Sequence, residues 1–94
     1  MVIVRWQKDD KFVEIEEGLS VDIKAPVVVV SSNAFAQGQM PIEWRAPVPR
    51  ADEQKVQELT RSVQRWAESH GYSQTQADSV VSSKGTGTAD GILP

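Results

Sequence analysis

The residue types best suited to contact chemistry lie in the proline-rich segment from Met40 to Arg50. It reads Met-Pro-Ile-Glu-Trp-Arg-Ala-Pro-Val-Pro-Arg, so its prolines stiffen a chain that carries Trp44 and Arg45. Tryptophan and arginine are enriched at the hot spots of protein interfaces, and stiffness lowers the ordering cost of binding. The sequence therefore predicts a partner-binding segment formed by Met40, Ile42, Trp44 and Arg45. The alternative is a connector whose Trp44 closes the core.

Arginine and tryptophan are adjacent at three places in the chain: Arg5-Trp6, Trp44-Arg45 and Arg65-Trp66. Such pairs stack on the bases of a single strand when they share one surface. However, the net charge is −3, and no segment has the dense basic charge that phosphate binding requires. A nucleic-acid-binding domain that uses these pairs on the sheet surface is therefore the alternative function, and the charge disfavours nucleic acid as a partner.

Residues that catalyse reactions or ligate metals are few and isolated. The chain has no cysteine, and its single histidine, His70, has no accompanying nucleophile motif. The acidic residues between positions 9 and 17 lack the spacing of a calcium loop, and the glycines after Lys84 lack the order of a phosphate loop. We therefore predict no catalytic residue, no cofactor and no metal site, and a carboxylate-based hydrolase ranks last among the functions considered.

Length and composition are those of one small folded domain. The chain has 94 residues, of which 39% are hydrophobic and 24% charged. Its longest apolar run, residues 25–30, is far shorter than a membrane-spanning helix. The N-terminus lacks the pattern of a signal peptide, so a cytoplasmic location is the default expectation. We expect a domain at residues 1–72 and a flexible, Ser-, Thr- and Gly-rich tail at residues 73–94.

The first half of the chain is typical of β-structure. Residues 2–6 and 12–16 are predicted strands, joined by a charged hairpin tip at residues 8–11. A turn at Glu17-Gly18 should precede a strand at residues 19–24, whose dry face is formed by Leu19, Val21 and Ile23. The valines at 27–30 predict a strand covered on both faces, and residues 40–45 predict an edge strand.

The second half holds one amphipathic helix, predicted at residues 52–70. Asp52 is a suitable N-cap and Gly71 a suitable C′ residue. Apolar residues recur at steps of three and four and form one stripe: Val56, Leu59, Val63, Trp66 and Ala67. The predicted fold class is therefore α+β, with an antiparallel sheet of four or five short strands (residues 2–45) packed by the helix. A partly open barrel capped by the helix is the main variant.

These features together favour a small non-enzymatic protein-interaction module, such as an adaptor, inhibitor or assembly subunit. The expected partner is another protein or a second copy of the chain, and no membrane partner is expected. The stiff Trp44–Arg45 segment, a predicted edge strand and a tail able to order on binding are the features suited to contact.

Overall fold

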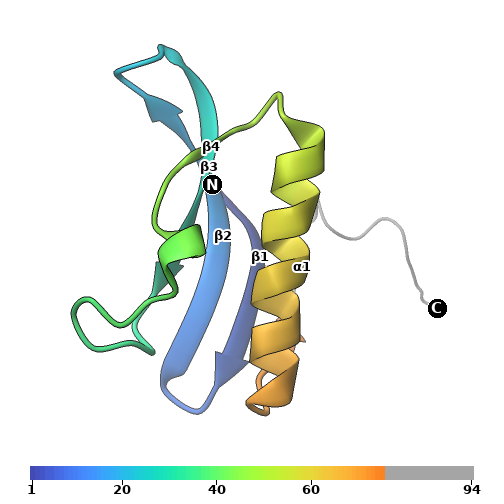
Figure 1. Ribbon diagram of the computed structural model, residues 1–94. Coiled ribbons are helices and arrows are strands. Elements are labelled where there is room, and N and C mark those ends of the chain that lie inside the picture. Colours follow the sequence, from blue (N-terminus) through green and yellow to red (C-terminus); the bar gives the residue numbers. More distant parts are fainter. Residues whose placement is uncertain (76–94) are drawn as a thin grey trace, which may run out of the picture.

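A computed structural model describes residues 1–75 and shows a five-stranded antiparallel sheet with one α-helix packed on it (Figure 1). The strands are β1 (Val2–Lys8), β2 (Lys11–Ser20), β3 (Ala25–Ser32), β4 (Val48–Pro49) and β5 (Ser73–Thr75). Their order in the sheet is β4-β3-β2-β1-β5, with a short 3-10 helix η1 (Ile42–Trp44) and the helix α1 (Glu53–Ser69) between β3 and β5 in the chain. The predicted α+β class is confirmed. The sheet is open at β4 and β5, so the barrel variant is not formed.

The hydrophobic core lies between one face of the sheet and α1. Alternate residues of the central strands point toward the helix, as the period of a strand requires. The buried cluster consists of Val4, Trp6, Val13, Ile15, Val28, Trp44, Leu59, Val63 and Ala67. Residues of one sheet face and of one helix stripe therefore share a single core, as the sequence patterns predicted.

The helix α1 begins and ends as its sequence predicts. The carboxylate of Asp52 accepts a hydrogen bond from the backbone N–H of Lys55 at 3.2 Å. At the other end His70 is the C-cap, and Gly71 follows with a φ of 84°, a left-handed conformation that favours glycine. Within the predicted stripe, Leu59, Val63 and Ala67 are buried, while Val56 and Trp66 are half-buried.

Substitution of Asp52 tests this N-cap. We expect Asp52→Ala to lower the free energy of unfolding by about 1 kcal/mol, because the N–H of Lys55 loses its acceptor. Asp52→Asn keeps a side-chain oxygen and should lower it by much less. Urea unfolding followed by circular dichroism measures both, and equal losses in the two variants would contradict the capping role.

The β2–β3 hairpin differs from the prediction for residues 17–24. Glu17 and Gly18 are not a turn: they lie inside β2, opposite Val28 and Val27 of β3. The turn occupies residues 21–24, so the predicted strand at residues 19–24 is wrong beyond Ser20. Gly18 pairs within an extended ladder with open space around it, so nothing forces a reversal there. The hairpin is consequently longer than predicted.

Residues 40–45 also differ from the prediction, because they form η1 and its flanks instead of an edge strand. The backbone N–H groups of Trp44 and Arg45 donate to the carbonyls of Pro41 and Ile42, which is the 3-10 pattern. The edge strand comes later, at β4. Within the predicted strand at 27–30, Val27 and Val28 are buried and the next two valines are half-buried.

The first residues of the predicted tail are part of the sheet. Ser73–Thr75 form β5, which pairs antiparallel with Arg5–Gln7 of β1. The hydroxyl of Thr75 adds a hydrogen bond to the carbonyl of Arg5 at 3.3 Å. The rest of the predicted tail, residues 76–94, lies outside the described residues.

Candidate functional site

Trp44, the central residue of the predicted binding segment, is buried in the core. Its side chain is 2% exposed, and its indole N–H donates to the hydroxyl of Ser62 on α1 at 3.0 Å. Its ring packs edge-on against Phe35 and Trp66, with centroids 5.8 Å away in each case. The indole therefore closes the core between η1 and α1 and has no surface to offer a partner.

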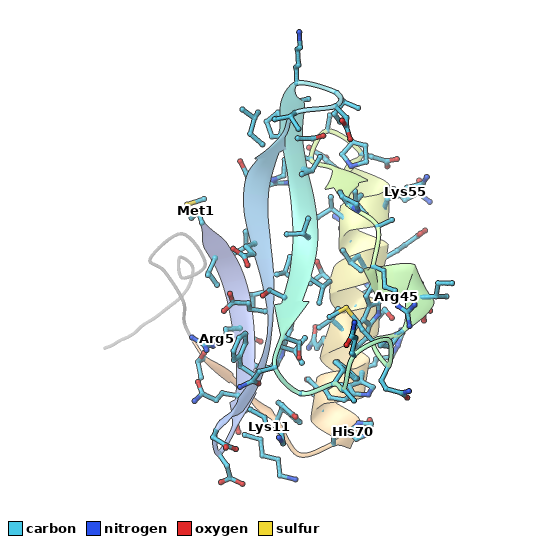
Figure 2. The ribbon with its side chains drawn as sticks, turned by 90° about the vertical axis from the view of Figure 1, so that its left-hand side faces the viewer. Met1, Arg5, Lys11, Arg45, Lys55 and His70 are labelled. Atoms are coloured by element: carbon cyan, nitrogen blue, oxygen red, sulfur yellow. The ribbon has the colours of Figure 1, made fainter. Side chains whose placement is uncertain are left out.

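The other three predicted residues have different surroundings. The guanidinium of Arg45 donates to two carbonyl oxygens of its own loop, those of Met40 at 2.7 Å and Gly38 at 2.6 Å (Figure 2). Met40 is half-buried against the core. Ile42 is 76% exposed. Of the four, Ile42 is thus the apolar side chain that a partner can reach.

The three Arg–Trp pairs do not present their indoles on one surface. Trp6 is buried on the helix-facing side of the sheet, and Trp44 is buried beneath η1. Arg5 lies on the opposite face of the sheet, above the ring of Phe12 at 4.2 Å and 3.5 Å from the carboxylate of Glu14. Base stacking needs exposed rings, and two of these three rings are covered.

The exposed apolar residues gather instead at the end of the β2–β3 hairpin. Leu19, Val21 and Ile23 are 73%, 83% and 53% exposed. Among residues 1–75 the other large hydrophobic side chains of comparable exposure are Met1 and Ile42. We call residues 19–24 the hairpin tip. These three are the side chains that the alternating pattern predicted to form a dry face.

The hairpin tip projects because its neighbouring strands end below it. β1 reaches only to Glu17, where Met1 exchanges two backbone hydrogen bonds with it at 2.8 and 2.9 Å. On the other side, the last bond to β3 comes from the N–H of Arg50 to the carbonyl of Pro26. Past these points the hairpin has only its own two strands, and it extends beyond the N-terminal end of α1 (Figure 1).

The turn of the hairpin tip contains a strained residue. Lys24 has a φ of 53°, a conformation that costs a non-glycine residue about 1–2 kcal/mol. The turn is braced by a hydrogen bond from the N–H of Ile23 to the hydroxyl of Ser20 at 3.4 Å. Strained backbone is concentrated at contact and switch sites, which supports a functional role for the tip.

A groove opens near the base of the same hairpin, between α1, β4 and η1. It has a volume of about 270 Å³ and is lined by Glu43, Val48, Lys55, Glu58, Leu59 and Ser62. Val48 and Leu59 give it apolar walls, and charged residues stand around them. We call it the α1–β4 groove.

His70 is occupied by a structural contact at the other end of the molecule. Its ring stacks on Trp66 at 4.3 Å, and its Nδ1 lies 2.8 Å from the carbonyl oxygen of the same residue. The ammonium of Lys8 donates to the carbonyl of His70 at 3.2 Å. Among residues 1–75, no three histidine or carboxylate side chains come close enough to hold a metal ion.

Two comparisons with general classes of protein complete the description. Within the described part of the chain, no helix has the length and apolar character needed to cross a bilayer. No protein-family model matches the sequence, and no curated protein or solved structure is significantly similar to it.

Proposed function

We propose that the protein is a non-enzymatic protein-interaction module whose contact element is the hairpin tip. The observation that carries this proposal is the clustering of three exposed aliphatic side chains on one projecting turn. Complete burial of each such side chain contributes about 1.5–3 kcal/mol, which makes the tip an effective anchor for a partner with an apolar cleft. Clustered exposed apolar residues mark interaction sites more reliably than single ones.

The charges near the tip favour a protein over nucleic acid or an anionic membrane. Asp22 and Lys24 balance each other within the turn, and Glu17 pairs with Arg50 at 3.0 Å beneath it. Phosphate backbones and anionic lipids require clustered lysine and arginine. The tip also lacks tryptophan and tyrosine, which are typical of membrane-interface anchors.

Residues 40–45 remain a second candidate for the contact, now through Ile42. Its side chain is exposed on η1, on an adjacent part of the surface that includes Glu43 of the groove. Since Trp44 and Arg45 are engaged within the fold, this contact would depend on a single aliphatic side chain. The tip offers three.

Affinity capture with matched variants tests the proposal. We expect full-length protein to retain a stoichiometric protein partner, itself included, from a nuclease-treated lysate, and Val21→Asp to lose it. Ile42→Asp introduces the same charge at an equally exposed valine-sized site and should retain it. Circular dichroism should show both variants folded, since neither side chain contributes to the core.

The opposite pattern, loss with Ile42→Asp alone, would move the contact site to residues 40–45. Capture of no protein by any form, together with no self-association, would contradict the interaction function. Retention of nucleic acid in place of protein when nuclease is omitted would favour the alternative function.

A further inference from the structure

We propose that the partner of the hairpin tip is a second copy of this chain, and that the tip of each copy docks into the α1–β4 groove of the other. This inference rests on the proposed function and specifies the partner. It is carried by the presence, on one chain, of a projecting apolar turn and an open groove with apolar walls. The two surfaces match in polarity and in the arrangement of their charges.

The groove can receive an aliphatic side chain. Val48 of β4 and Leu59 of α1 form its apolar walls, and its volume of about 270 Å³ is open to the surface. The tip presents Val21 at its most exposed point, with Leu19 and Ile23 beside it. A β-branched side chain in this groove would remove its own surface and that of the two wall residues from water.

The charges of the tip complement those of the groove. Asp22 and Lys24 flank Ile23, so the tip carries one acidic and one basic side chain on either side of an apolar residue. Lys55 and Glu58 lie on successive turns of α1 at the groove and carry the reverse pair. A docked tip can therefore place Asp22 near Lys55 and Lys24 near Glu58, which fixes the orientation of docking.

A reciprocal arrangement is favoured over a one-way contact. Stable interfaces bury roughly 1,200–2,000 Å² in total, which is more than one hairpin turn can supply. In a two-fold dimer the tip and the groove of each copy are both used, so the contact occurs twice and no binding surface is left free. The groove and the hairpin are close in the fold, because Val48 pairs with Val28 of β3. Two antiparallel copies can thus exchange tips across one axis.

Analytical ultracentrifugation of the full-length chain over a range of concentrations tests this dimer. We expect a monomer–dimer equilibrium, with a dissociation constant raised at least about 100-fold by Val21→Asp, because the apolar contact is lost at both sites. Ile42→Asp is the matched control and should leave the constant unchanged.

Charge exchange identifies the groove. The double variant Asp22→Lys with Lys24→Glu reverses the tip, and Lys55→Glu with Glu58→Lys reverses the groove, and neither changes the net charge. Each should raise the dissociation constant roughly 10-fold, since like charges then face each other. All four substitutions combined should restore the constant to near the wild-type value. These side chains are exposed, so the fold is preserved.

A monomer at every concentration would overturn the inference, as would a dimer that Val21→Asp leaves intact. Additive weakening by the two charge exchanges without restoration would exclude the groove as the docking site. A series of growing polymers would exclude the closed two-fold dimer. If the chain is monomeric and yet captures a different protein in a Val21-dependent manner, the interaction function stands and only the second copy is excluded.

Discussion

Trp44→Ala should lower the free energy of unfolding by about 3–5 kcal/mol, which is a large part of the stability of a domain of this size. The indole is almost completely buried, and it joins η1 to the rings of Phe35 and Trp66. Its removal would leave a cavity that the short 3-10 turn cannot fill. It would also leave the hydroxyl of Ser62 without its donor.

Urea unfolding monitored by circular dichroism measures this loss, with two smaller substitutions as controls. Ser62→Ala should cost about 1–2 kcal/mol, because it leaves the buried indole N–H without an acceptor. Trp44→Phe should fall between the two, since it keeps an aromatic ring and loses the hydrogen bond. A change below about 1 kcal/mol in Trp44→Ala would show that the indole is not part of the core. A partner lost only on Trp44→Ala would therefore report unfolding, not a binding site.

The elements with redundant local signals could be predicted from sequence. The helix carries a capping aspartate, a stripe of apolar residues at helical spacing and a terminal glycine, and each signal sets the same bounds. The β1–β2 turn was equally clear, since four charged residues interrupt two apolar strands. At Asp9 the φ of 55° is a conformation that aspartate tolerates better than most residues.

The hairpin tip could not be located because alternation alone does not show what covers a strand. Leu19, Val21 and Ile23 have the spacing of a dry face, yet neighbouring strands and the helix end before they reach them. Whether a face is covered depends on the lengths of distant elements, here β1 and α1. The same pattern thus describes a buried face or an exposed contact surface.

The segment at residues 40–45 shows the converse problem. Tryptophan and arginine are frequent at interfaces, but both residue types also suit a compact loop. Here the indole fills the core and the guanidinium binds two carbonyls of its own loop. In a small domain, which has few large side chains to bury, an available tryptophan is more often required inside. The candidate site accordingly shifts from the stiff aromatic segment to the aliphatic turn.

Shortening the hairpin should separate contact from folding more completely than any single substitution. Gly18 and Val27 face each other in the ladder, so Asn-Gly can replace residues 19–26 as a two-residue turn. None of the replaced residues is buried, and the main loss is the hydrogen bond from Arg50 to the carbonyl of Pro26. We expect the free energy of unfolding to change by no more than about 1 kcal/mol, partly offset by the shorter loop.

The same variant should lose every contact that depends on the tip, whether the partner is a second copy or another protein. Sedimentation and affinity capture, performed beside the urea titration, measure both effects on one sample. A folded, monomeric variant that captures no partner is the expected result. A loss of more than about 3 kcal/mol would show that the tip is covered within the molecule, because removal of exposed side chains does not create a cavity. Unchanged binding by a stable variant would instead assign the contact to another surface, with Ile42 the next residue to substitute.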